Sequence, residues 1–219
     1  MRKIIVSTFL SMDGVLQGPG GPHEDLSQKF KQGGWSANYW DDMMEHTIAK
    51  QMADPYDLLL GRRTYEIFAA HWPYQKNDPI SAVFDRVQKY VVATTPVALS
   101  WQNSTLINGD VVNELKKLKN CDGPNLLVNG SGKLMQTLLK HNLVDVLHTW
   151  TFPVTLGAGK RLFEDGTQAA QWRLTNSSVS TTGVIMASYV PDGNVQLGSF
   201  VTEKISDAEI VRREKVSKE

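Results

Sequence analysis

The sequence predicts an α/β fold built on a mixed β-sheet. Two segments, 56–65 (YDLLLGRRTY) and 125–134 (NLLVNGSGKL), each join a short apolar strand to a helical pattern through glycine. This order of strand, turn and helix is typical of parallel sheets that bind nucleotides. Two alternating runs near the end of the chain, 172–181 and 183–190, predict an antiparallel hairpin. Parallel units followed by a hairpin indicate a sheet with both kinds of pairing.

Length and composition limit the classes of protein to consider. The 219 residues suffice for one well-filled α/β domain and a tail. Basic and acidic side chains balance at 23 each, so no global charge argues for a nucleic-acid partner. Cys121 is the single cysteine, the N-terminus lacks the pattern of a secretory signal, and no apolar run approaches the roughly 20 residues that cross a bilayer. We therefore expect a cytoplasmic protein without a membrane partner.

The first part of the chain predicts a central strand and then a long loop. Residues 3–10 are apolar and β-branched enough for the strand, which Ser11-Met12-Asp13-Gly14 ends. Residues 15–38 are rich in glycine and proline and have no periodicity. A loop of some 20 residues is either a functional cover or an inert, disordered excursion. We prefer a cover over a site.

Residues 39–53 predict an amphipathic helix with one candidate carboxylate. Apolar residues at intervals of four form its buried stripe: Trp40, Met44, Ile48 and Met52. Glu45 lies at the edge of this stripe. Such a carboxylate is commonly an ordinary surface charge, and the alternative is a group that contacts substrate.

Periodicity and breaker residues predict the remaining elements. Helices are expected from 64 to about 70 and over 80–87, 112–118 and 133–141, and strands over 89–95, 105–107 and 144–155. Asp110 is a predicted N-cap. Ser206 and Glu209 have the spacing of a capping box for a helix over 207–215. Residues 1–195 are thus predicted as the domain and 196–219 as a charged tail with a short helix.

The two glycine bends predict an anion site. Glycine lets the backbone turn sharply and expose N–H groups, and each following helix directs the positive end of its dipole there. The bends could hold the two ends of one phosphorylated ligand. Arg62 and Arg63 favour this, because arginines at a helix start oppose the dipole unless an anion lies nearby. Plain tight turns and solvated arginines are the alternatives, since neither bend carries a complete dinucleotide or phosphate-loop motif.

Five motifs together resemble the dihydrofolate reductase-like family. The resemblance is strongest to the reductase domain at the C-terminus of the bifunctional deaminase-reductase of riboflavin synthesis, and to its stand-alone relatives. In order, the motifs are Ser11-Met12-Asp13-Gly14, Leu60-Gly61-Arg62-Arg63-Thr64-Tyr65, Val128-Asn129-Gly130-Ser131-Gly132, Leu143-Val144-Asp145 and the 153–163 segment PVTLGAGKRLF. The agreement spans about residues 2–195. It implies a mixed, mostly parallel sheet of eight strands flanked by helices, with a C-terminal antiparallel hairpin.

The resemblance also implies NADPH as the cofactor, bound across the C-terminal edge of the sheet. The expected contacts are Gly61, Arg62, Arg63, Thr64, Thr94, Thr95, Asn129, Gly130, Ser131, Gly132, Lys133 and Leu134. One of the paired arginines would lie near the adenosine 2′-phosphate. The threonines would line the adenosine end, and the second bend would lie under the pyrophosphate.

On the substrate side, Asp13, Gly157 and Lys160 match segments that line the family's pocket. Glu45 stands about where folate reductases keep the helix carboxylate that binds the pterin ring, with Asp41 and Asp42 as competitors. If Glu45 faces the pocket, desolvation would raise its pKa and let it orient or protonate a ring nitrogen.

The resemblance thus implies an NADPH-dependent reductase that transfers hydride to a small heterocycle of pteridine or pyrimidine type, and a homodimer. The deaminase half is absent, because the chain has no H-x-E or P-C-x-x-C motif and its five histidines show no metal spacing. Val146 stands where riboflavin-type reductases usually have an acidic residue. The competing class is a non-catalytic relative that binds a dinucleotide or another ligand with the same fold.

Overall fold

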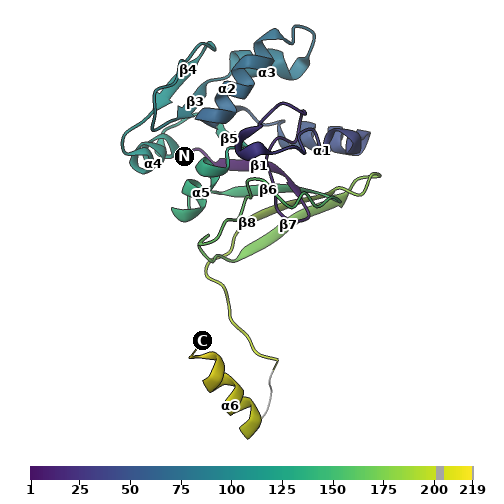
Figure 1. Ribbon diagram of the computed structural model, residues 1–219. Coiled ribbons are helices and arrows are strands. Elements are labelled where there is room, and N and C mark those ends of the chain that lie inside the picture. Colours follow the sequence, from purple (N-terminus) through teal and green to yellow (C-terminus); the bar gives the residue numbers. More distant parts are fainter. Residues whose placement is uncertain (201–204, 219) are drawn as a thin grey trace.

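A single eight-stranded sheet forms the centre of the protein, whose computed structural model describes residues 1–200 and 205–218. The strand order is β4-β3-β2-β5-β1-β6-β8-β7 (Figure 1). The strands are β1 (Ile4–Ser11), β2 (Tyr56–Gly61), β3 (Lys89–Val92), β4 (Ser104–Ile107), β5 (Asn125–Asn129), β6 (Val146–Phe152), β7 (Trp172–Val179) and β8 (Ile185–Pro191). The pairs among β1 to β6 are parallel, whereas β8 pairs antiparallel with both β6 and β7. The expected mixed sheet is confirmed.

Helices cover both faces of this sheet. They are α1 (Asp42–Gln51), α2 (Arg62–His71), α3 (Pro79–Arg86), α4 (Val111–Asn120) and α5 (Gly132–Lys140), followed in the tail by α6 (Asp207–Val216). On one face, α4 and α5 pack on alternate residues of the strands, such as Ile4 and Val6. On the opposite face, α2 and α3 pack on Leu58 and Leu60, and α1 packs on Trp150. The central strands β1, β2 and β5 therefore bury side chains on both faces, which alternate along each strand, whereas the edge strand β7 is largely exposed.

Some helices and strands begin or end at residues other than those predicted, because of specific N-caps and prolines. The helix expected from residue 39 begins at Asp42, since the Asp41 carboxylate accepts from the backbone N–H of Met44 at 2.9 Å and caps it. The strand expected over 144–155 ends at Phe152, before Pro153, which has no N–H to donate. Asp110 caps α4 through the N–H of Asn113, as predicted.

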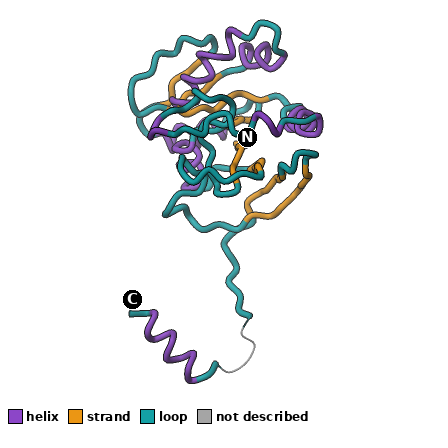
Figure 2. The backbone as a smooth tube through the Cα atoms, turned by 45° about the vertical axis from the view of Figure 1, so that its right-hand side comes forward, coloured by secondary structure: helices purple, strands orange, loops and turns teal. Residues whose placement is uncertain are grey.

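The tail leaves the sheet after β8 and carries α6 at its end (Figure 2). Ser206 accepts from the N–H of Glu209, so the expected N-cap is present. Glu209 does not complete the capping box, because its carboxylate pairs instead with Arg212 and Arg213. No residue of α6 is buried.

Lys89, at the start of β3, is a fully buried cation that the sequence did not reveal. Its Nζ donates to the carbonyls of Asp85 (3.1 Å) and Val87 (3.0 Å) and lies 4.3 Å from the centre of the Trp101 ring. Burial lowers the pKa of Lys89 to about 8. The folded protein therefore holds this proton less tightly than the unfolded chain does.

Stability should consequently rise with pH in a window that Lys89 controls. Between about pH 8 and the ordinary lysine value of 10.5, the unfolded chain binds the proton that the folded chain has lost, so the free energy of unfolding increases. In Lys89→Met this contribution is absent. Urea unfolding from pH 7.5 to 10 should show a smaller rise for the variant than for the wild type, and equal slopes would contradict the assignment.

Candidate functional site at the C-terminal edge of the sheet

The two glycine bends lie in contact at the C-terminal edge of the sheet. β2 and β5 are neighbouring parallel strands, paired at Leu58 and Leu127, so both end at this edge. A Cβ placed on Gly61 would lie only 1.9 Å from Ser131 Oγ and 2.8 Å from Ser131 Cβ. Only glycine fits at position 61 unless Ser131 moves. The expectation that the two bends lie side by side is confirmed.

The helices that start at these bends lack side-chain caps. Within the described part of the chain, the first turns of α2 and α5 receive no hydrogen bond from an N-cap side chain. Each of the other four α-helices has one, from Asp41, Asp78, Asp110 or Ser206. Backbone N–H groups at an uncapped helix start favour anions. The two exceptions are the two helices that begin at the shared edge.

The backbone of the second bend is held in a strained form. Gly130 has φ of +79° and Ser131 has φ of +83°. Glycine adopts such angles readily, but residues with a side chain rarely do, so the strain lies at Ser131. Among the described residues no carbonyl accepts from the N–H of Ser131, whereas the pairing of Asn129 with Ser7 directs the Gly130 N–H toward the Ser7 carbonyl of β1. Strain of this kind is typical of ligand-binding turns.

Arg62 and Arg63 lie at the first bend and already have partners within the protein. Arg62 pairs with Glu66 along α2 at 2.8 Å. Arg63 donates to Ser27 Oγ at 2.7 Å and lies 3.8 Å from the Asp25 carboxylate. An anion at this bend would therefore compete with Ser27 and Asp25 for Arg63.

The other expected cofactor residues are distributed around the same edge. Thr94 and Thr95 are exposed and follow β3, which ends at Val92 and not at residue 95 as predicted. Val92 pairs with Gly61, so the threonines come just beyond the level of the first bend. Thr64 is buried, and Lys133 is exposed. The side chain of Leu134 belongs to the core on the α5 face, which leaves only its backbone to face a ligand.

Asp13 ties the end of β1 to the 156–161 segment. Its carboxylate accepts from Ser11 Oγ (2.6 Å) and from the N–H groups of Leu156 (3.0 Å) and Gly157 (2.8 Å). These bonds, that of Ser11 foremost, lower the pKa of Asp13 to about 2. Arg161 donates to the Asp13 carbonyl at 2.9 Å. Asp13 and Gly157 are thus brought together, and the carboxylate acts here as a clamp on the segment.

Asp25 anchors the long loop over 15–38 across the edge. Its carboxylate forms an ion pair with Lys160 and lies near Arg63 of α2. Burial alone would raise the pKa of Asp25, but hydrogen bonds from Lys160 and Ser27 outweigh it and hold the pKa below its usual value. Leu16 of the same loop would meet a Cβ on Gly132 at 3.9 Å. The loop therefore contacts both bends and the 156–161 segment.

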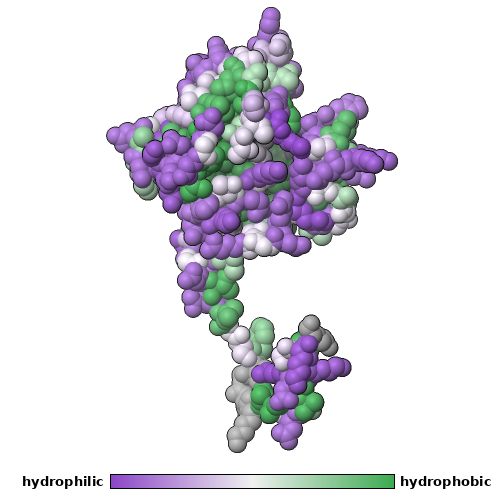
Figure 3. Space-filling model, turned by 60° about the vertical axis from the view of Figure 1, so that its left-hand side comes forward, coloured by the Kyte–Doolittle hydropathy of each residue, from purple (hydrophilic) through white to green (hydrophobic). Residues whose placement is uncertain are grey.

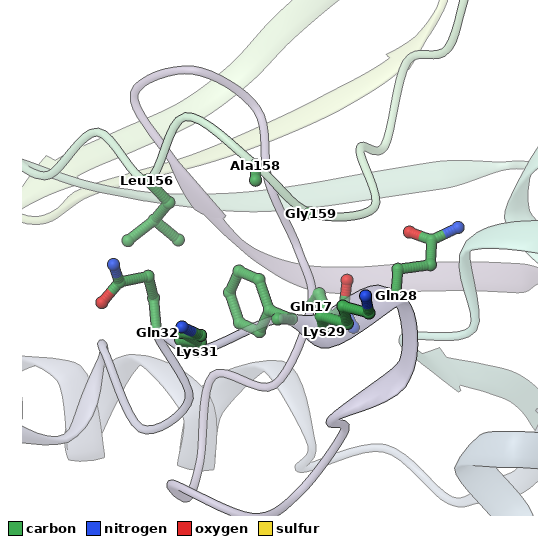
Figure 4. Close-up of a pocket in the computed structure, with 9 residues that line it drawn as sticks. Gln17, Gln28, Lys29, Lys31, Gln32, Leu156, Ala158 and Gly159 are labelled. Atoms are coloured by element: carbon green, nitrogen blue, oxygen red, sulfur yellow. The ribbon is translucent and has the colours of Figure 1, made fainter.

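A cavity of about 300 Å³ lies between this loop and the 156–161 segment (Figure 4). Its walls are Gln17, Gln28, Lys29, Phe30, Lys31, Gln32, Leu156, Ala158 and Gly159. Gln17 is nearly inaccessible to solvent, and both ends of its amide are hydrogen-bonded to the loop and to Lys160. The volume is at the lower limit of small-molecule sites.

The carboxylates near the start of α1 differ in their surroundings. Asp41 caps α1 and also accepts from the N–H of Thr181, so it ties the helix to the loop after β7. Asp42 and Glu45 are exposed. Met44, between them, is fully buried. Of the three acids, Asp41 has a clear structural role, and the contact of Glu45 with substrate stays a prediction.

Sequence reasoning named Asn129 but missed the row of polar side chains that it forms beneath α1 with Ser7 and His148. Ser7 pairs with Asn129 of β5 and with His148 of β6, so the three residues stand side by side on adjacent strands. In each strand, every second residue is apolar and faces inward, and one polar residue takes such a position. An example is Ser7 between Ile5 and Phe9. That break in the pattern was the available signal.

Residues 1–200 and 205–218 contain neither a candidate metal-ion site nor a candidate membrane-spanning helix. No group of three or more histidine, cysteine, aspartate or glutamate side chains there could hold a metal ion. None of the helices in those ranges combines the length and the apolar character needed to span a bilayer.

Comparison with known proteins places this arrangement among reductase-like folds. The model of the RibD C-terminal domain matches residues 2–186. The uncharacterized protein YyaP of Bacillus subtilis (strain 168) is 26% identical over 193 residues, which cover 86% of this chain and 94% of YyaP. A putative riboflavin biosynthesis protein from Shewanella sp. PV-4 superposes with a TM-score of 0.64 at 20% identity, covering 88% of this chain and 99% of that one.

A dihydrofolate reductase from Enterococcus faecalis, solved in complex with NADP(H) and RAB-propyl, has the same fold at greater distance. Its TM-score is 0.55 at 14% identity, with 87% of this chain and 96% of that chain covered.

The contact at Gly61 predicts an asymmetric response to two alanine substitutions. Gly61→Ala would force Ser131 away and should lower the free energy of unfolding by about 1–3 kcal/mol, the usual cost of overpacking. Gly132→Ala is the matched control, because its Cβ would meet only ordinary contacts at 3.9 Å or more. Urea unfolding measures both, and equal losses would refute the close approach.

Proposed function

Because this chain belongs to the RibD C-terminal domain family, we propose that it is an NADPH-dependent reductase that transfers hydride to a small heterocycle of pteridine or pyrimidine type. The observation that carries the proposal is the contact between two uncapped helix starts at one edge of the sheet. A dinucleotide has two phosphates close together, and such an edge offers N–H groups from two backbones at once.

The residues present fit the phosphates of this cofactor. The bend at Gly130 and Ser131 presents the Ser131 N–H, which has no acceptor among the described residues, and Gly61 has no side chain to block it. We assign the pyrophosphate to these two bends, the 2′-phosphate to Arg62 or Arg63, and the adenosine end to Thr94 and Thr95. Asn129, Gly132, Lys133 and Leu134 complete this set through the second bend.

When bound, NADPH supplies the hydride. The protein has to bind the cofactor and the substrate, orient them toward each other and exclude water. Asp13 and Gly157 fix the 156–161 segment, and the loop that Asp25 anchors covers the edge. Lys160 contributes by holding that loop. These contacts favour a closed, ordered site, which is the condition for hydride transfer without loss to solvent.

The fold alone is equally compatible with a relative that binds the dinucleotide and reduces nothing, so binding and turnover are measured separately. NADPH at 100 times its Kd should stabilise the protein by about 2.7 kcal/mol in a thermal-shift experiment. Oxidation of NADPH in the presence of reducible pteridines and pyrimidines then reports turnover. A shift without turnover would leave a binding protein, and no shift would refute the cofactor assignment. Light scattering tests the predicted homodimer.

The paired arginines should discriminate between the two nicotinamide cofactors. Losing a charge-assisted hydrogen bond costs about 1.5–3 kcal/mol, so Arg62→Ala or Arg63→Ala should raise the Kd for NADPH roughly tenfold or more, with little effect on NADH. Arg173→Ala, an exposed arginine on β7, is the control. Equal effects on both cofactors would remove the 2′-phosphate role.

Glu45 is our candidate for the group that orients or protonates a ring nitrogen of the substrate. It lies in the first turn of α1 and is exposed in the structure, so it would act from the rim of the site. Glu45→Ala should lower kcat on an identified substrate by about tenfold to a hundredfold and leave the Kd for NADPH unchanged. Unchanged turnover would exclude Glu45 from the reaction.

A further inference from the structure

The cavity between the 15–38 loop and the 156–161 segment has no role in the proposed function. None of the residues predicted to contact cofactor or substrate lines it. Figure 4 shows Leu156 on one wall and Gln32 on the other. Its volume of about 300 Å³ gives room for a small organic molecule. The cavity is therefore a candidate site for a second ligand.

Close packing fixes the walls of this cavity. Phe30 is only 5% exposed, and a Cβ on Gly159 would lie 3.0 Å from its ring, so the two segments meet over a glycine. The side-chain amide of Gln17 donates to the Ser27 carbonyl at 3.0 Å and accepts from the N–H of Lys160 at 3.1 Å. The cavity is thus part of the packed structure and not a gap beneath a loose loop.

Lysine supplies all the charge around the cavity. Lys29 and Lys31 are the only charged residues of its walls, and no described residue forms an ion pair with either. The two carboxylates of the loop are engaged elsewhere. Glu24 accepts from backbone N–H groups of two glycines, and Asp25 forms an ion pair with Lys160. The cavity therefore presents positive charge that the protein does not neutralise, which favours an anion.

One of these lysines belongs to a strained turn. In the described part of the chain, five residues other than glycine have positive φ: Gln28, Lys29, Asn103, Ser131 and Asn142. Asparagine tolerates such angles, and Ser131 belongs to the second glycine bend. Gln28 and Lys29 are adjacent, both have φ of +59°, and both line the cavity. Strain at residues of these types is typical of segments that bind ligands.

We propose that this cavity binds a small organic carboxylate with an apolar ring, at a site separate from the cofactor edge. Lys29 and Lys31 pair with the carboxylate, and Phe30, Leu156 and Ala158 contact the ring. A cation would be repelled by the two ammonium groups, and an inorganic anion would leave the apolar walls uncovered. The inference goes beyond the proposed function, since the site contains no cofactor residue.

The experiment titrates the full chain with benzoate in a calorimeter, at low ionic strength and without NADPH. Benzoate carries a carboxylate on one ring, and a ligand of this size should bind with a Kd of about 1 mM. Benzamide has the same shape without the charge, and acetate has the charge without the ring. Each should bind at least tenfold more weakly than benzoate, because each lacks one of the two contacts.

Two variants locate the binding. Combined Lys29→Gln and Lys31→Gln substitutions should weaken benzoate at least tenfold, whereas Lys76→Gln with Lys116→Gln, at exposed positions elsewhere, should not change its Kd. Both pairs are exposed, so Tm should stay at the wild-type value. Ala158→Phe places a ring in the cavity from an exposed position and should abolish binding.

The proposal is overturned if benzoate does not bind the wild-type protein, or if benzamide or acetate binds as tightly. It is also overturned if the Lys29 and Lys31 double variant binds benzoate as the wild type does. Benzoate would then occupy another anion site, such as the glycine bends, and Arg63→Ala would weaken it instead. Failure of NADPH to bind would refute only the proposed function, because the titration contains no cofactor.

Discussion

The close approach of Gly61 to Ser131 is the contact on which the rest of the site depends. Parallel pairing of β2 and β5 brings two strand ends to one edge, and the missing side chain at 61 lets the following turns touch. Two helix starts then point their free N–H groups at one place. A methyl group at residue 61 would separate them. The contact between the two bends thus follows from one glycine and one strand pairing.

Capping divides the helices of this protein into two groups. Four α-helices of the described chain begin at an aspartate or serine that satisfies a backbone N–H. α2 and α5 lack such caps, and Ser131 sits in a strained conformation at one of them. Asp13 and Asp25 supply order around these starts by binding backbone N–H groups and Lys160. Helix caps are thus missing where we expect the ligand, and the contacts of Asp13 and Asp25 order the segments around that place.

Local patterns in the sequence were enough for the sheet, both bends, the hairpin and the Asp110 cap, because each depends on neighbours along the chain. The start of α1 was misplaced because Asp41 caps it, a choice between adjacent residues that periodicity does not make. The polar row was missed since Ser7, Asn129 and His148 meet only through strand register. The cofactor contacts remain predictions, as the fold fixes positions and not ligands.

The most direct test of the central claim is a titration of the isotope-labelled protein with NADPH, followed through backbone amide signals. If the two bends form one site, the amides of Arg63 and Thr64 and those of Gly130 to Gly132 will shift together, with a single Kd. Shifts confined to one bend, or two bends that respond at different concentrations, would contradict the account.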